Sequence, residues 1–349
     1  MIPGVSSSAP AFSEFHPLST GELMDRAVGF WRSHWKPLFQ LYLAFQLVGY
    51  ALLKLLLWAM RAWSPLLQDG LALAAAIRND PTEVARQSVV GVGATAGIFG
   101  AYAWVVWFAS IAGARYVVDE CLSQKPSPSG SIRYAFARLG PGTRSLFLMA
   151  LQLAAVWLLL VIAMALTVGF ASLFGKGSGG AAGVVFVLGG TAVACFIFVV
   201  GFLWFMLRFT LISPVLAVEG LGASASIKRS GELMSGRLGP GVMNGVKVRA
   251  TILITAMMLV VLVVTSLGSI PSVFLTLAYA RDSEGIFAVS RGVPEIFLIP
   301  AELFHVGVQS LFAPLYAALV SIFYLDMRVR REGLDLELKM RELTGGGAR

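Results

Sequence analysis

Two polar patterns interrupt the long apolar stretches of this chain, and they hold the side chains best suited to chemistry. In the first, a hydrogen-bonding side chain recurs at every fourth position: Tyr42, Gln46, Tyr50 and Lys54. In the second, three polar side chains share one helical face: Glu302, His305 and Gln309. Residues three or four apart are neighbours on a helix, so each set is predicted to form a stripe. Lys54 and Glu302 are expected toward the same side of the membrane, where they could pair.

Two interpretations of these stripes are open. Charged residues at membrane depth are rare and often functional, so the stripes could line a path for protons or a solute between the first and sixth apolar stretches. Alternatively, Lys54 and Glu302 extend their charges outward to the interface, and the other groups make ordinary hydrogen bonds between helices.

Composition indicates which elements must position these stripes. Hydrophobic residues make up 57% of the 349 residues and charged residues 13%, with a mean hydropathy of +0.78, whereas a soluble domain holds about 25% charged residues. Six runs carry at most one charge and are long enough to cross a bilayer: 37–60, 87–114, 145–175, 177–207, 250–280 and 303–325. The predicted fold class is all-α, a single integral membrane domain (1–349) that forms a polytopic bundle of six transmembrane helices.

One pattern occurs three times along the chain: a short amphipathic stretch, a proline, and then a pair of spans. The amphipathic stretches are residues 24–37, 129–141 and 227–240, and the last two share the string RLGPG. The repeat predicts three units, at about 18–120, 126–220 and 221–330, and a solvated helical tail, 326–349. Ser19 and Glu22 fit a capping box at the start of the first short helix.

Each short stretch has an apolar face and a basic face, which is typical of a helix lying in the membrane interface. The apolar faces are predicted to lie in lipid: Leu23, Ala27, Phe30, Trp31 and Trp35; Ile132, Ala135, Phe136 and Leu139; Ile227, Leu233 and Met234. The basic faces supply candidate contacts for lipid headgroups or a partner: Arg26, Arg32, Arg133, Arg138, Lys228, Arg229 and Arg237. These helices either anchor the bundle mechanically or together form a cytoplasmic platform.

The distribution of Lys and Arg predicts the orientation. Most of the 27 such residues lie near the amino terminus, in the loops after the second and fourth spans, and after the sixth span. The opposite side holds few: Arg61, Arg78, Arg86, Lys176, Arg281 and Arg291. Loops rich in Lys and Arg stay in the cytoplasm, so both termini are predicted to be cytoplasmic. Because the basic residues lie beside spans rather than in one patch, nucleic acid is not an expected partner.

Motifs for catalysis or metal binding are missing from the sequence. It contains neither G-x-S-x-G nor H-E-x-x-H. Cys121 and Cys195 fall in a loop and a span and predict neither a disulfide framework nor a metal cluster, and the three His residues have no ligand spacing. Residues 1–20 lack the apolar core of a signal peptide. We therefore expect no catalytic residue, no metal and no cofactor.

Three segments carry a family resemblance. Residues 17–36, residues 207–237 (with Arg208, Pro214 and Glu219) and residues 324–338 resemble segments of bacterial proteins that carry the glycerophosphoryl diester phosphodiesterase membrane domain. The resemblance implies a membrane module in the bacterial cytoplasmic (inner) membrane. The phosphodiesterase barrel of some relatives needs about 250 residues and its own acidic metal ligands, which we do not expect here. The resemblance therefore implies no phosphodiester hydrolysis, and no catalytic residue is carried over.

Three functions are compatible with these patterns. The first is a non-enzymatic scaffold or lipid-interacting module, whose partners are membrane lipids or another membrane or cytoplasmic protein. The second is a transporter or flippase of a lipid or other amphiphile, which uses the two polar stripes; parallel repeats offer it no ready rocking mechanism. The third is a membrane-embedded lipid hydrolase. A continuous polar cavity lined by the stripes would favour the second, whereas a dry bundle would exclude it.

Overall fold

The computed structural model describes residues 17–63, 80–122, 124–174, 181–237, 245–279, 293–334, 336 and 340. Within these ranges the chain is helical, and its β-type pairing is limited to one bridge between Arg237 and Gly245. Among the residues that the structure describes, six helices are long and apolar enough to cross a membrane: Trp35–Ala59, Thr82–Cys121, Leu139–Phe170, Val187–Val218, Val246–Gly268 and Glu295–Glu332. An all-helical fold with six helices able to span a membrane is therefore confirmed.

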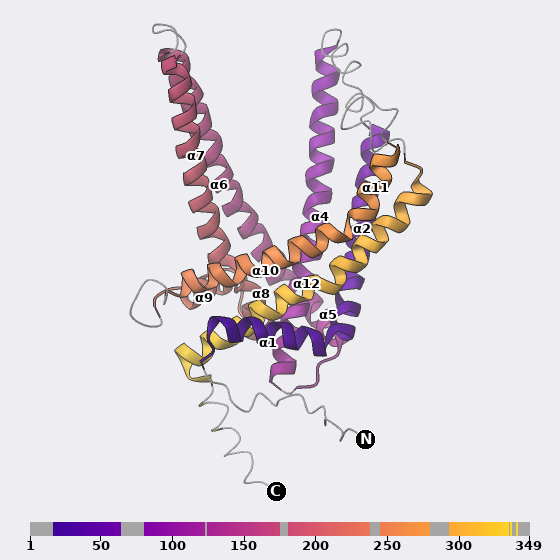
Figure 1. Cartoon of the computed structure of the whole chain (residues 1–349), viewed down its shortest axis with the longest axis vertical. Coiled ribbons are helices and arrows are strands. Elements are labelled where there is room, and N and C mark those ends of the chain that lie inside the picture. Colours follow the sequence, from indigo (N-terminus) through magenta and orange to yellow (C-terminus); the bar gives the residue numbers. More distant parts are fainter. Residues whose placement is uncertain are drawn as a thin grey trace. The chain divides into compact units, whose positions relative to one another are not determined.

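The chain divides into two compact units, Met1–Arg138 with Ile252–Arg349, and Leu139–Thr251. The first contains α1 (Thr20–Ser33), α2 (Trp35–Trp63), α4 (Pro81–Cys121), α5 (Pro128–Ala137), α11 (Ile270–Tyr279) and α12 (Glu295–Glu332). The second contains α6 (Leu139–Phe174), α7 (Ala181–Phe209), α8 (Ile212–Val218) and α9 (Ala223–Leu233). The helix α10 (Val246–Gly268) begins in the second unit and continues into the first (Figure 1).

Prolines decide where several helices end. A proline clashes with the helical carbonyl four residues before it, yet it fits the first turn of a helix. Three prolines lie third in a helix: Pro37 in α2, Pro141 in α6 and Pro214 in α8. The preceding helices end four or five residues upstream, at Ser33, Ala137 and Phe209. The corner predicted at Pro37 consequently lies at His34, between α1 and α2.

The fifth apolar run, 250–280, holds two helices rather than one. α10 ends at Gly268, and α11 begins at Ile270, directly before Pro271. A Cβ atom on Gly268 would lie 2.9 Å from Val308 Cγ1 on α12. This glycine therefore permits a close approach between α10 and α12 that a larger residue would obstruct.

α12 is the helix around which the first unit packs, because it contacts α1, α2, α4 and α11. Every residue from Ala317 to Met327 is buried. A helix that is buried on all sides must be hydrophobic all round, and the uncharged run 303–325 provides such a surface. Pro314 stands inside α12 without ending it.

α1 begins with the predicted capping box and then packs on protein. The Glu22 N–H donates to Ser19 Oγ at 3.3 Å, and the Ser19 N–H donates to Glu22 Oε2 at 2.6 Å. Leu23, Ala27 and Phe30 are buried, and α1 contacts α12. The prediction that this apolar face lies in lipid is therefore wrong for these three residues. The apolar surface of α12 takes the place of lipid.

The other short helices also bury apolar residues that were assigned to lipid. On α9, Ile227, Leu233 and Met234 are buried within the second unit. On α5, Ala135 is buried, whereas Phe136 stays 41% exposed. The exposed residues Trp35 and Leu139 remain available to lipid. Trp31 is half-buried, and its indole Nε1 donates to the Leu311 carbonyl of α12 at 2.8 Å.

A buried carboxylate fastens the segment before α1 to the end of α12. The Leu18 N–H donates to Asp326 Oδ1 at 2.8 Å, and Arg330 Nη2 donates to the Leu18 carbonyl at 2.6 Å. Arg330 Nε also donates to both carboxylate oxygens, and the Asp326 side chain is 0% exposed. The prediction that a solvated helical tail begins at residue 326 is wrong in its solvation, because Asp326, Met327 and Val329 are buried, although the helix continues to Glu332. The helix ends at Gly333, whose φ of 63° favours glycine.

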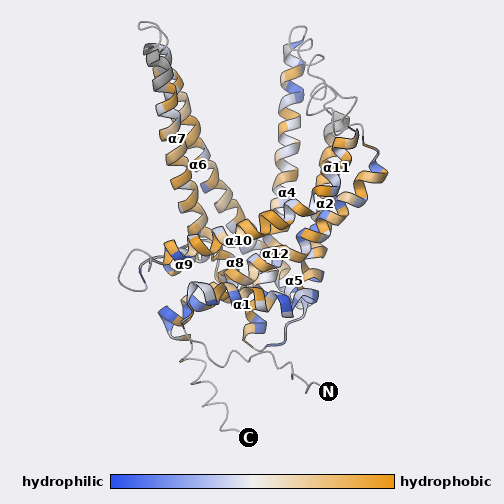
Figure 2. Ribbon diagram, viewed as in Figure 1, coloured by the Kyte–Doolittle hydropathy of each residue, from blue (hydrophilic) through white to orange (hydrophobic). Residues whose placement is uncertain are grey.

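The second unit combines an apolar hairpin with a polar cluster. α6 and α7 pack against each other and are hydrophobic over most of their length (Figure 2). No residue in the most apolar 18-residue window of α6 is buried. In the cluster, Arg229 of α9 donates to Glu219 Oε2 at 2.9 Å, and Ser230 Oγ donates to the Arg208 carbonyl at 2.7 Å. These polar residues therefore tie α9 to the ends of α7 and α8.

Replacing Asp326 by Ala should destabilise the protein by about 2 kcal/mol, because it leaves a buried N–H and a guanidinium without their acceptor. Thermal unfolding of the full chain in mild detergent measures the effect. Glu332→Ala is the control, since it removes an acidic side chain that Arg328 contacts near the surface of the same helix. Equal losses in the two variants would contradict a special role for Asp326.

Two glycines of α4 should respond oppositely to alanine. A Cβ atom at Gly113 would collide with the Tyr42 side chain of α2, whereas a Cβ atom at Gly97 would meet nothing within 4 Å. Alanine favours a helix over glycine by about 1 kcal/mol, so Gly97→Ala should leave the protein as stable or more stable. Gly113→Ala should lower the unfolding temperature. A gain in stability for both variants would show that α2 and α4 do not meet closely at Gly113.

Candidate functional site

A cavity of about 240 Å³ lies among α2, α4 and α12 in the first unit. It is lined by the following residues: Gln46, Tyr50, Leu53, Lys54 and Leu57 of α2, Tyr102 of α4, and Glu302, His305, Val306 and Gln309 of α12. Six of the seven residues in the two predicted stripes therefore face one space. The spacing explains this, because each stripe occupies one face of its helix and α2 packs against α12.

An ion pair lies at one end of this cavity. Lys54 Nζ is 2.6 Å from Glu302 Oε2, and Tyr50 Oη donates to the same oxygen at 2.9 Å. Lys54 also contacts Glu295 Oε2 at 3.1 Å. The Lys54 and Glu302 side chains are each 24% exposed. The pairing of Lys54 with Glu302 that the sequence suggested is thus present, and it joins α2 to α12.

A histidine and a glutamine form the second polar group. His305 Nε2 and Gln309 Nε2 lie 2.9 Å apart, one helical turn from each other on α12. If the Gln309 amide donates, the His305 proton is on Nδ1; if the amide is flipped, Nδ1 is an acceptor. In either case Nδ1 is buried without a hydrogen-bond partner in the described part of the chain. The cavity therefore contains a polar atom whose hydrogen-bonding capacity is unused.

One predicted residue lies elsewhere, and two others join the site. Tyr42 does not line the cavity; it is buried against Gly113. Tyr102 lines the cavity, and its ring approaches Gly49, where a Cβ atom would lie 3.0 Å from Tyr102 Cε2. Tyr102 is a single polar side chain in an apolar stretch, so no periodic pattern in the sequence could have indicated that it belongs to the site. Glu295 lies seven residues before Glu302, and that spacing could have indicated the shared helical face.

The predicted basic contacts lie on three short helices. Arg26 and Arg32 are on α1, Arg133 is on α5 with Arg138 at its carboxyl-terminal cap, Lys228 and Arg229 are on α9, and Arg237 lies just beyond α9. The Lys228 side chain is 81% exposed, whereas Arg229 pairs with Glu219 at 2.9 Å. Arg229 therefore stabilises the second unit. That the basic residues form one platform stays a prediction.

A second polar cavity of about 240 Å³ lies between α4 and α5. Arg115 lines it and pairs with Asp119 at 2.7 Å. The Arg115 guanidinium also lies over the Tyr134 ring at 4.6 Å, and the Arg138 guanidinium lies 5.7 Å from the same ring. Ser127 caps the amino terminus of α5 beside these groups. Arg115 thus lines this cavity together with Asp119, and Arg138 contacts the Tyr134 ring without being among the lining residues.

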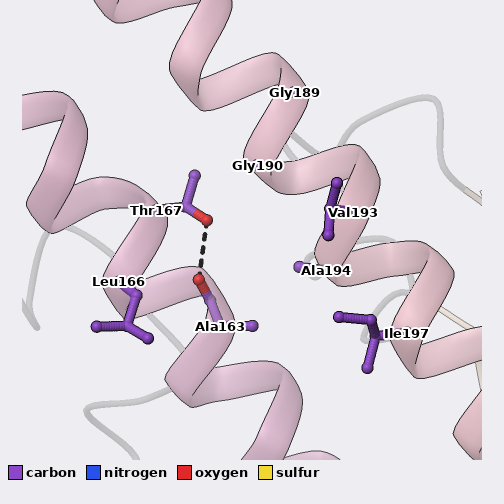
Figure 3. Close-up of a pocket in the computed structure, with 8 residues that line it drawn as sticks. All are labelled: Ala163, Leu166, Thr167, Gly189, Gly190, Val193, Ala194 and Ile197. Atoms are coloured by element: carbon purple, nitrogen blue, oxygen red, sulfur yellow. Dashed lines mark hydrogen bonds between the residues drawn. The ribbon is translucent and has the colours of Figure 1, made fainter.

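A larger hollow, of about 510 Å³, lies between α6 and α7 but offers little chemistry (Figure 3). Thr167 is its one hydroxyl-bearing residue, and that hydroxyl donates to the Ala163 carbonyl within α6 at 2.8 Å. A Cβ atom at Gly190 would collide with Thr167. This glycine therefore lets the helices cross closely, and the hollow beside the crossing is apolar.

Comparison of the chain with protein-family models, with curated proteins and with solved structures finds no match. Within the described ranges, no three His, Cys, Asp or Glu side chains are grouped so that they could hold a metal ion.

A double-mutant cycle should show that Lys54 and Glu302 are coupled. Lys54→Met leaves two carboxylates without their shared cation, so it should destabilise more than Glu302→Gln. The double variant should be more stable than the sum of the two losses predicts, by about 1 kcal/mol. Thermal unfolding in detergent measures all four proteins. The control cycle uses Lys228 and Glu232, which lie 3.9 Å apart and are exposed, and should give little coupling. Additive effects at Lys54 and Glu302 would contradict the pairing.

Proposed function

We propose that the protein binds an amphiphile in the membrane and moves it between the leaflets, holding the polar headgroup in the cavity among α2, α4 and α12. The observation that carries this proposal is the convergence of six predicted stripe residues on that one cavity. Of the functions considered from the sequence, this is the alternative that required a polar cavity between the first and sixth spans. The proposed activity is non-enzymatic.

The free-energy cost of the polar groups supports a binding role. Polar and charged side chains at membrane depth are costly and persist where they serve a purpose. Interhelical hydrogen bonds alone contribute only about 0.6 kcal/mol each, and the buried His305 Nδ1 makes none within the described part of the chain, while Gln46 lines the same cavity. A ligand headgroup that bonds to these atoms would account for them.

The surroundings of the cavity favour an amphiphile over a fully water-soluble solute. Leu53, Leu57 and Val306 share the wall with the polar groups, and α2 exposes Val48, Leu55 and Trp58 along its surface. A molecule with a polar head and an apolar chain satisfies both kinds of surface. Binding pockets commonly combine apolar walls with a few convergent polar groups.

We also propose that the chain is built as three copies of a short amphipathic helix followed by two spans, with both termini in the cytoplasm of a bacterium and the spans in its inner membrane. The element order supports this, because a short helix precedes each of α2, α6 and α10. The charge distribution supports the orientation. The segments resembling the glycerophosphoryl diester phosphodiesterase membrane domain support the choice of membrane.

A second candidate function is the lipid-interacting scaffold suggested by the basic short helices. The observation that favours it is the pair of arginines at Tyr134 beside the α4–α5 cavity: the Arg115 guanidinium, which lines the cavity, lies 4.6 Å from the ring centroid, and that of Arg138 lies 5.7 Å from it. Paired arginines suit the phosphate of a lipid headgroup. In this role the α4–α5 cavity would hold the protein to anionic lipid without moving it.

The proposed movement can be tested in liposomes containing the full chain. Amphiphiles labelled on the acyl chain with the fluorophore NBD are placed in both leaflets, and dithionite then bleaches only those that reach the outer leaflet. Three head classes are used: glycerol, amine and phosphate. At least one should exchange about tenfold faster than in protein-free liposomes, which corresponds to a barrier about 1.4 kcal/mol lower.

The variant Gln46→Leu/His305→Leu should abolish this acceleration, because it fills the cavity with apolar groups. Val193→Leu is the matched control, since Val193 is exposed and lines the apolar hollow on α7. Size-exclusion chromatography verifies that each variant folds. Failure of all three amphiphiles to exchange faster, or an unaltered rate in the double variant, would refute the proposed function.

A further inference from the structure

The charges of the cavity among α2, α4 and α12 decide which headgroup it can accept. Lys54 is the one permanent cation, and Glu302 the one carboxylate, among the described residues that line it. They lie 2.6 Å apart, and Lys54 is also held by Glu295 at 3.1 Å. Two carboxylates therefore engage the single ammonium group.

A phosphate headgroup is disfavoured by this arrangement. It would have to compete with Glu302 and Glu295 for Lys54, and both carboxylates would repel it within a few ångströms. Removing one partner of an ion pair away from water leaves the other charge uncompensated, which is costly. No other Lys or Arg lines the cavity in the described part of the chain.

An ammonium headgroup is disfavoured for the converse reason. Glu302 Oε2 already accepts from Lys54 at 2.6 Å and from Tyr50 at 2.9 Å. A second ammonium bound to this carboxylate would lie close to Lys54 Nζ, and the two like charges would repel each other. Among the described residues, the lining supplies no second carboxylate for it, because Glu295, which contacts Lys54 at 3.1 Å, is not one of the lining residues.

The remaining polar groups are neutral and match hydroxyl groups. Gln46 and Gln309 each offer donors and an acceptor, and His305 Nδ1 is a buried atom in need of a partner. A hydroxyl both donates and accepts, so it satisfies Nδ1 in either tautomer. Neutral groups also cost less than ions to bring to membrane depth.

The size and walls of the cavity agree with a compact headgroup. A volume of 240 Å³ corresponds to about eight water molecules in the liquid, enough for a glycerol unit or one sugar ring. The Tyr50 and Tyr102 side chains give the carbon skeleton of such a headgroup an aromatic surface, and their hydroxyls add hydrogen-bonding groups.

We propose that the headgroup bound among α2, α4 and α12 is an uncharged polyol, so that the amphiphile is a neutral lipid with free hydroxyls. This inference rests on the proposed function and specifies its substrate class. Gln46, Gln309 and His305 bind the hydroxyls, while the Lys54–Glu302 pair stays intact and excludes charged heads. Gly49 is a positioning residue, because its missing Cβ lets Tyr102 approach α2.

Native mass spectrometry of the full chain in lipid nanodiscs tests the inference with three amphiphiles that share an 18-carbon monounsaturated chain: 1-monooleoylglycerol, oleylamine and oleoyl lysophosphatidic acid. Monooleoylglycerol should bind about tenfold more tightly than the other two. Gln46→Leu should reduce its binding about tenfold and leave the weak binding of the charged probes unchanged. Glu302→Gln should instead increase the relative binding of lysophosphatidic acid, because it removes a repelling carboxylate and releases Lys54.

Each outcome decides the question. Preferential binding of monooleoylglycerol that Gln46→Leu removes supports the inference. Equal or tighter binding of oleylamine or lysophosphatidic acid, lost in Gln46→Leu/His305→Leu, overturns the headgroup class but leaves the proposed function standing. Binding of no probe, or binding that the double variant leaves unaltered, overturns both. Gln152→Leu on α6, outside this unit, is the control for a polar-to-apolar change within a span.

Discussion

The first unit depends on the burial of the carboxyl-terminal part of α12. Residues 317–327 are surrounded by protein, and Asp326 is the acidic residue among them. A carboxylate can be buried there because it accepts from the Leu18 N–H and from Arg330. Its burial fixes the segment before α1, so that α1 lies along α12. Glu302 and His305 lie on the same helix, several turns before Asp326. The placement of α12 therefore also determines the position of the cavity.

The cavity among α2, α4 and α12 lies toward the amino-terminal end of α12, whereas the contacts of Asp326 lie toward its carboxyl-terminal end. Between Glu302 and Asp326 the helix rises about 36 Å, which exceeds the hydrocarbon thickness of a bilayer. Each of these two acidic residues is paired with a cation: Glu302 with Lys54, and Asp326 with Arg330. The Asp326 side chain is 0% exposed and that of its partner Arg330 20%, whereas the Lys54 and Glu302 side chains are each 24% exposed. In the proposed function, Glu302 is therefore the carboxylate that a ligand can approach, and Asp326 is structural.

The sequence allowed local properties of the chain to be predicted, such as which segments form spans. It did not reveal which distant segments pack against each other. Charge depletion reveals spans, and the four-residue spacing reveals the stripe that ends at Lys54. A lipid tail and a protein helix both favour apolar side chains, so the face of Leu23 was assigned to lipid although it packs within the protein. Asp326 lies beside basic residues and resembles solvated sequence; its burial depends on Leu18, 308 positions away. Tyr102 has no polar neighbour at helical spacing, and only the packing of α4 on α2 brings it to the site.

In the proposed function, the position of Tyr42 sets a condition for movement of the headgroup. On the interpretation of the stripes as a path, the first stripe would line that path from Tyr42 to Lys54; of its four residues, Gln46, Tyr50 and Lys54 line the cavity. Tyr42 is buried and packs on Gly113, where no side chain separates α2 from α4. A headgroup that leaves the cavity toward α1 must therefore pass the contact between Tyr42 and Gly113. At that contact the Tyr42 ring packs directly on the backbone of Gly113. In the proposed function, α2 and α4 would therefore have to separate there for the headgroup to pass.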